Sequence, residues 1–105
     1  MEAQKLKLPN ENNCLACDAF IVINFAPKDP VKEEDLKRIY FINNEFNAQI
    51  VDLKILTFDQ VNVCSHITLP ATGLEAHEWR LLWKQKNPAI KPETKMCVYY
   101  YKKLK

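Results

Sequence analysis

Glycine is almost missing from this sequence: its 105 residues include only Gly73, whereas glycine makes up roughly 7% of an average protein. Walker-type phosphate loops and Rossmann dinucleotide fingerprints both need several glycines where the backbone approaches a phosphate. The sequence also lacks an apolar run near the roughly 18 residues of a membrane span, since the longest run is residues 19–23. These absences exclude a phosphate-loop enzyme, a dinucleotide-binding fold and a spanning helix within these residues.

An export signal is missing as well, because residues 1–9 contain no apolar stretch of signal-peptide length. We therefore expect an intracellular protein, cytoplasmic or nuclear and not secreted, whose four cysteines are reduced thiols. Apolar residues make up 48% of the chain, which is enough for a single core. We expect a polar N-terminal arm over residues 1–13 and one domain over residues 14–105.

Two segments have the signals of helices. Asp29 can cap a helix that begins with a proline and continues, with an apolar arc, over residues 30–46. Thr72 and Glu75 have the spacing of a capping box, which predicts a second helix over residues 72–86. The Asn-Pro pair that follows residue 86 is a typical helix end.

Four segments are typical of strands. Residues 19–25 are a continuous apolar run rich in β-branched and aromatic side chains, which indicates a central, buried strand. Residues 50–58 and 60–69 alternate apolar and polar side chains, so we expect them to form a hairpin. Residues 95–103 are rich in tyrosine and valine, which favour a strand.

The order strand-helix-strand-strand-helix-strand predicts an α+β fold, a ferredoxin-like βαββαβ sandwich. In this fold both helices cover one face of a four-stranded antiparallel sheet. Residues 19–25 and 60–69 would form its middle. Residues 50–58 and 95–103 would form its edges, where backbone groups are free to pair with another chain.

Cysteine and histidine offer one candidate metal site. Cys14 and Cys17 form a C-x-x-C pair, but a structural zinc site needs four ligands. Cys64, His66 and Cys97 would have to complete the site, and in the expected sheet another strand separates them. The alternative interpretation is that the cysteines are small, buried or half-buried thiols. We therefore predict no metal and no cofactor.

Catalytic sets of residues are equally hard to assemble. A redox pair needs its thiols at the start of a helix that follows a strand, whereas Cys14 and Cys17 precede a strand. Cys64 and His66 share one face of a predicted strand but lie about 6–7 Å apart along it. No serine, histidine and aspartate combine into a triad. We expect a protein that is not an enzyme.

Charge is distributed unevenly along the chain. Residues 1–69 contain 7 Lys/Arg and 10 Asp/Glu, whereas residues 70–105 contain 8 Lys/Arg and 3 Asp/Glu. The basic C-terminal third can meet an acidic surface or a phosphate backbone. Arg80 and Lys84 occupy the outer side of the second predicted helix and are candidate contacts.

Aromatic side chains mark further candidate contacts. In the last predicted strand, Tyr99 and Tyr101 point away from the helices onto an open sheet face, and Lys102 and Lys103 follow them. Phe41 lies outside the apolar arc of its predicted helix, so it is either a loosely covered ring or a partner contact. Such a surface suits a protein partner or unpaired bases.

These observations favour a protein–protein interaction module or a small subunit of a larger assembly. Its partner would be another protein or a second copy of the chain, bound through a sheet edge or the open sheet face. The alternative is a single-stranded nucleic-acid-binding protein. No membrane partner is expected.

The alternative has support from a resemblance. The strand at residues 20–25, followed by Pro27 and by the acidic residues 33–35 and Leu36, resembles the opening of an RNA-recognition motif. That family has the predicted strand order and displays aromatic rings on its first and third strands for base stacking. The family's third strand has glycine and aromatic residues on the open face, where this chain has Asn62, Cys64, His66 and Thr68. The resemblance covers residues 20–36 and implies a similar architecture.

Overall fold

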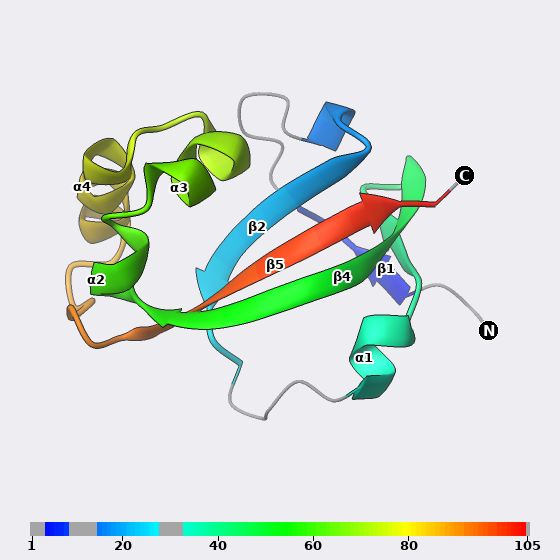
Figure 1. Cartoon of the computed structure of the whole chain (residues 1–105), viewed down its shortest axis with the longest axis horizontal. Coiled ribbons are helices and arrows are strands. Elements are labelled where there is room, and N and C mark those ends of the chain that lie inside the picture. Colours follow the sequence, from blue (N-terminus) through cyan, green and yellow to red (C-terminus); the bar gives the residue numbers. More distant parts are fainter. Residues whose placement is uncertain (1–3, 9–14, 28–32, 105) are drawn as a thin grey trace.

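The computed structural model describes residues 4–8, 15–27 and 33–104. In this part of the chain five strands and four helices form an α+β fold (Figure 1). In chain order they are β1 (Gln4–Leu6), β2 (Ala19–Phe25), α1 (Glu33–Lys37), β3 (Tyr40–Ile42), β4 (Phe46–Thr57), α2 (Phe58–Val61), α3 (Ser65–Thr72), α4 (Ala76–Lys86) and β5 (Lys95–Lys103).

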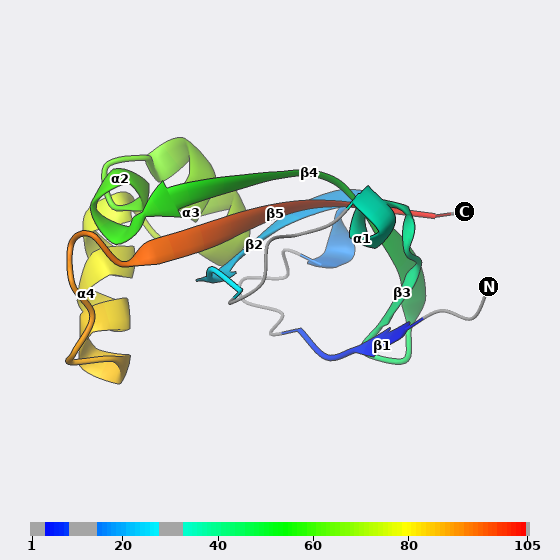
Figure 2. The same ribbon diagram turned by 90° about the horizontal axis from the view of Figure 1, so that it is seen from below.

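The strands form one open, mixed sheet in the order β1-β3-β4-β5-β2. β1 runs parallel to β3, and the other neighbouring strands are antiparallel. Figure 2 shows that β3 turns out of the plane of β4 and β5, so that β1 lies beneath them. A register shift between Ile50 and Asp52 marks an irregularity in the long strand β4, and such bulges bend strands. The sheet is therefore strongly curled.

The expected α+β class is confirmed, but the ferredoxin-like strand order is wrong. β5 lies inside the sheet between β4 and β2, whereas β2 lies at an edge. The predicted antiparallel pairing of residues 19–25 with residues 95–103 is confirmed, with Ile21 opposite Tyr100. The apolar run of β2 reflects packing on both faces of the strand, because Phe20 and Ile21 belong to different cores. It does not reflect two strand neighbours.

The helix predicted to continue to residue 46 is wrong over most of its length. Its proposed start at Asp29 lies outside the described residues, and α1 ends at Lys37. A hairpin of β3 and β4 follows. Asn43 and Asn44, with φ of 51° and 57°, form its turn, and the Glu45 N–H donates to the Ile42 carbonyl at 2.9 Å. Two consecutive positive φ values are typical of a tight hairpin turn, and asparagine tolerates them better than most residues.

The strand predicted over residues 60–69 is also wrong, because α2 and α3 occupy this segment. Thr57 caps α2: its hydroxyl accepts the Gln60 N–H at 3.1 Å, and the Gln60 side chain accepts the Thr57 N–H at 2.9 Å. In α3 the buried residues are Ile67, Thr68 and Ala71, which is a helical spacing. Local capping and helical packing thus override the period-two pattern.

The helix predicted over residues 72–86 is confirmed from Ala76 onward, but its start differs. Thr72 ends α3, Gly73 caps that helix with φ 78°, and Glu75 caps α4 instead. The helix stops at Asn87 as expected, where the Asn87 N–H donates to the Trp83 carbonyl at 2.8 Å.

Two cores lie on opposite faces of the curled sheet. The helix-side core lies beneath α2–α4 and contains Phe58, Val61, Ile67, Trp79, Met96 and Val98. The strand-side core lies inside the curl and contains Leu15, Phe20, Tyr40, Ile42, Ala48, Ile50 and Tyr101. Because β5 alternates its side chains, it contributes to both.

Candidate functional site

The outer edge of β2 is the candidate functional site. The Lys103 N–H donates to the Asp18 carbonyl at 2.7 Å, and the Ala26 N–H donates to the Lys95 carbonyl at 3.0 Å. In an antiparallel ladder these bonds place the backbone groups of the even-numbered residues of β2 toward β5. The groups of Ile21 and Ile23 therefore point outward, and no other described residue pairs with them.

The sequence of β2 has none of the features that usually protect a sheet edge. Ala19–Phe25 contains no charged residue and no proline. Natural edge strands commonly carry a lysine, a proline or a bulge that prevents pairing with another chain. The far end of β2 is blocked, because the Phe25 N–H donates to the Asn24 side-chain Oδ1 at 2.8 Å. At Ile21 and Ile23 the outward backbone groups have no hydrogen-bond partner among the described residues, and α3 packs against β2.

A groove of about 420 Å³ runs along this edge. β2 supplies one part of its lining, including Ile21 and Ile23, while α4 supplies Leu82 and Trp83. The segment that follows β1 contributes Leu8, since the curl brings that segment toward β2 (Figure 2). The groove therefore combines an unpaired strand edge with apolar walls.

Phe25 extends the apolar wall. Its side chain is 41% exposed, and its ring meets that of Trp83 edge-on at 5.2 Å between centroids. Phe25 and Asn87 also line a second hollow of about 330 Å³, which continues to Ile90. The two hollows therefore meet at Phe25 and Asn87.

The charged lining of the groove is basic. Lys7 and Lys86 line it, and no described carboxylate does. Lys86 lies in the last turn of α4 together with Lys84. An extended ligand with acidic groups would therefore meet complementary charge.

The structure places Tyr99 and Tyr101 on the face that the sequence predicts, opposite Met96, Val98 and Tyr100. That face is not open, however, because the curled strands β1 and β3 cover it. Tyr101 is only 4% exposed, and its ring stacks on Phe20 at 5.0 Å with 7° between the planes. Burial raises the pKa of both the Tyr99 and the Tyr101 phenol. The prediction that Tyr101 is a surface contact is wrong, because the curl of the sheet buries it.

The predicted basic residues do not form one site. Lys102 is exposed on β5, whereas the Lys103 Nζ lies 4.3 Å from the centroid of the Phe46 ring. Arg80 is half-buried and Lys84 is exposed on α4, and neither lines the β2 groove. Lys86, which sequence reasoning did not single out, is the α4 lysine at the groove.

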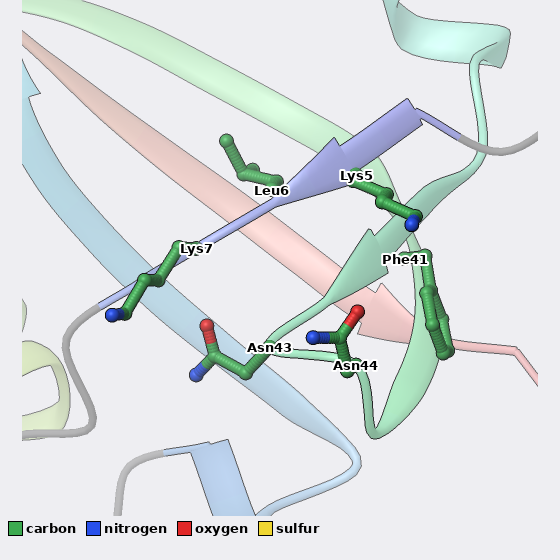
Figure 3. Close-up of a pocket in the computed structure, with 6 residues that line it drawn as sticks. All are labelled: Lys5, Leu6, Lys7, Phe41, Asn43 and Asn44. Carbon is green, nitrogen blue, oxygen red and sulfur yellow. The ribbon is translucent and has the colours of Figure 1, made fainter.

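Phe41 lies elsewhere, on the outer side of β3. It lines a hollow of about 360 Å³ together with Lys5, Lys7 and Asn44 (Figure 3). Its side chain is half-buried on a strand, so the prediction that it projects from a helix is wrong. The two lysines come from the region expected to be a polar arm.

The cysteines do not form a site in the described residues. Cys17 is exposed, Cys64 is half-buried and Cys97 is buried, while Cys14 lies outside the described residues. Burial raises the pKa of the Cys97 thiol. No group of three or more His, Cys, Asp or Glu side chains in residues 4–8, 15–27 and 33–104 could hold a metal ion.

The sequence did not reveal the β2 edge, because the predicted strand order placed residues 19–25 inside the sheet and residues 95–103 at its edge. One available signal was the Asn43-Asn44 pair, which follows Ile42 and precedes Glu45 and Phe46 and is typical of a tight hairpin turn. A hairpin turn at this position makes residues 46–57 a strand that pairs with residues 40–42, instead of the end of a helix.

None of the helices in the described residues has the length and the apolar character that a membrane span needs.

The geometry defines a class of site: an unprotected strand edge beside an apolar groove with basic rims. No family model, curated protein or solved structure matches the chain. The residues of the site are therefore the basis for its function.

Proposed function

We propose that this chain is a non-enzymatic protein–protein interaction module that binds an extended segment of a partner protein along the edge of β2. One observation carries this proposal: the outward backbone groups of Ile21 and Ile23 pair with no described residue and lie beside an apolar groove. Addition of a strand to a sheet edge obtains affinity from main-chain hydrogen bonds and specificity from pockets for alternate side chains. The β2 groove supplies both.

The partner segment has a definable chemistry. Alternate side chains of a bound strand would face the groove walls formed by Leu8, Leu82 and Trp83, so these should be apolar. Side chains near the rims would meet Lys7 and Lys86, so acidic residues should be favoured. A second copy of the chain is a poorer occupant, because β2 itself carries no acidic residue.

The experiment uses a displayed library of random peptides, selected on the purified protein. The selected peptides should alternate apolar residues and contain Asp or Glu. Their binding should be measured by fluorescence anisotropy to the wild type and to Ile23→Pro. Proline at this position removes an outward N–H, which an edge strand tolerates, and also replaces a side chain that packs against the helix-side core.

Two matched variants separate loss of pairing from loss of packing. Ile23→Ala retains the N–H but shortens the side chain, as proline also does, so it should bind the selected peptides more tightly than Ile23→Pro. Asn24→Pro removes an N–H that faces β5, so it should destabilise the fold itself. Equal peptide binding by wild type and folded Ile23→Pro would refute edge pairing.

A further inference from the structure

A second surface lies on the outer side of the ribbon formed by β1 and β3. Lys5 pairs with Phe41 across the two parallel strands. Leu6 packs against the strand-side core, so Lys5 and Lys7 project from the opposite side of the chain, as Figure 3 shows. The result is an aromatic ring beside Lys5, with Lys7 toward the other end of a hollow of about 360 Å³ (Figure 3).

Asn43 fixes the geometry of this surface. Its side-chain Oδ1 accepts the Leu8 N–H at 2.7 Å, and its Nδ2 donates to the Leu8 carbonyl at 2.9 Å. The Asn43 N–H also donates to the Leu6 carbonyl at 2.9 Å. These three bonds hold the backbone on both sides of Lys7 against the turn, so the lysine is presented from a constrained segment.

The neighbouring Asn44 has a different role. It is exposed at φ 57°, and its side chain lies beside the Phe41 ring in Figure 3. No described residue forms a hydrogen bond with its amide, which can therefore both donate to and accept from a ligand. The hollow thus combines a π-face, two cations and an uncommitted amide.

We propose that this surface, formed by Lys5, Lys7, Phe41 and Asn44, binds single-stranded nucleic acid. A base stacks on the Phe41 ring, adjacent phosphates meet the two lysines, and the Asn44 amide contacts a base edge. Stacking platforms flanked by basic residues are the usual means of binding unpaired strands. An acidic peptide would use the lysines but would leave the flat aromatic face without a matching group.

This site is separable from the β2 groove even though Lys7 lines both. Lys5, Phe41 and Asn44 line only the hollow on the outer ribbon, whereas Ile23 lines only the groove. Variants at Lys5 and Phe41 therefore test nucleic-acid binding alone. Ile23→Pro tests peptide binding alone, so failure of one proposal can be distinguished from failure of the other.

The test uses fluorescently labelled oligouridylate and oligothymidylate of about 12 nucleotides, which is within the usual site size. Phe41→Leu should weaken binding of both probes roughly 10-fold, because it removes the stacking face but keeps an apolar side chain. Phe41→Tyr should restore binding. Lys5→Gln should lower the slope of log affinity against log salt by about 0.7, since one phosphate contact is lost.

The matched control is Lys84→Gln, which removes the same charge from α4, outside the hollow. It should leave the affinity nearly unchanged, and thermal unfolding should show that every variant is folded. Equal losses for Lys5→Gln and Lys84→Gln would indicate diffuse charge attraction and would overturn the proposal. Unchanged binding by Phe41→Leu, or displacement of the probe by polyglutamate with the same strength as by unlabelled oligonucleotide, would overturn it as well.

Discussion

The two cores of this protein are built by different means. The helix-side core is closed by separate elements, α2–α4, which cover one face of the sheet with Phe58 and Trp79 at the contact. The centroids of these two rings lie 5.2 Å apart. The strand-side core is closed by the sheet itself, since β3 and β1 curl over the other face and bury Tyr101. One core depends on local helices and the other on the bending of a single sheet.

This difference explains why β2 is left with an open edge. β2 contributes Phe20 to one core and Ile21 to the other, so both of its faces are occupied. The side chains of the strand are thus packed on both faces, while the outward backbone groups of Ile21 and Ile23 have no partner in the part of the chain that the structure describes. A curl that stops before closing leaves the groove along this edge, and the proposed partner strand would extend the sheet there.

The largest expected effect is at the centre of the helix-side core. Trp79 is fully buried, so Trp79→Ala should lower the free energy of unfolding by roughly 3–5 kcal/mol. Urea denaturation would measure this change. Trp79→Phe is the control. It should lower the free energy of unfolding by less than Trp79→Ala does, because the indole Nε1 has no hydrogen-bond partner in the described residues. A loss below 1 kcal/mol, on the order of a surface change, would contradict a helix-closed core.

The strand-side core should respond at Tyr101. Tyr101→Ala removes a ring that stacks on Phe20 and should destabilise the protein by about 3 kcal/mol. The same substitution at a surface tyrosine would lower the free energy of unfolding by less than about 0.5 kcal/mol. Chemical denaturation of Tyr101→Ala beside the more exposed Tyr100→Ala distinguishes the two cases. If Tyr100→Ala were the more damaging change, the assignment of faces along β5 would be reversed.

The curl itself should depend on the hairpin turn. Asn43→Ala removes two side-chain hydrogen bonds to Leu8 and places alanine at a positive φ. We expect the free energy of unfolding to fall by about 2 kcal/mol. Asn43→Gly retains the backbone freedom and should recover part of that loss. Thermal unfolding of the two variants would show their order. Identical stabilities for Asn43→Ala and wild type would mean that the clamp does not hold the curl.

Alkaline pH should weaken the strand-side core in particular. Burial raises the pKa of Tyr101 in the folded protein above about 10, its value in an unfolded chain. Above that pH the unfolded state releases the proton and the folded state keeps it, so stability falls by about 1.4 kcal/mol per pH unit for this residue. Denaturation at several pH values would measure the slope, and Tyr101→Phe should reduce it. An unchanged slope in Tyr101→Phe would show that this phenol is not the source.

Local patterns predicted α4 and the faces of β5 in the helix-side core, but not α2 and α3, and they predicted little of the strand-side core. Helical and strand periodicity and helix capping are properties of neighbouring residues. They predicted the burial of Trp79, the end of α4 near Asn87 and the faces of β5. The curl of the sheet depends on contacts between residues distant in sequence, such as Lys5 with Phe41. A period pattern contains no information about such pairings.

The same limit applies to the candidate site. Lys102 is exposed, but Tyr99 packs against the strand-side core, because the curl of the sheet covers the face that local patterns leave open. The β2 edge could not be predicted without the strand order, because a continuous apolar run suits a central strand as well as an edge strand packed on both faces. Phe41 was identified as a candidate contact, although its neighbours Lys5 and Lys7 were not.

The most direct test of the account is amide hydrogen exchange along β2 in the free protein, measured by NMR. An open edge predicts an alternation: the amides of Phe20 and Val22, which face β5, should exchange slowly, whereas those of Ile21 and Ile23 should exchange much faster. On addition of a selected peptide, Ile21 and Ile23 should become protected. Uniformly slow exchange at all four amides in the free protein would show that the edge is already paired, and would contradict the proposed partner site.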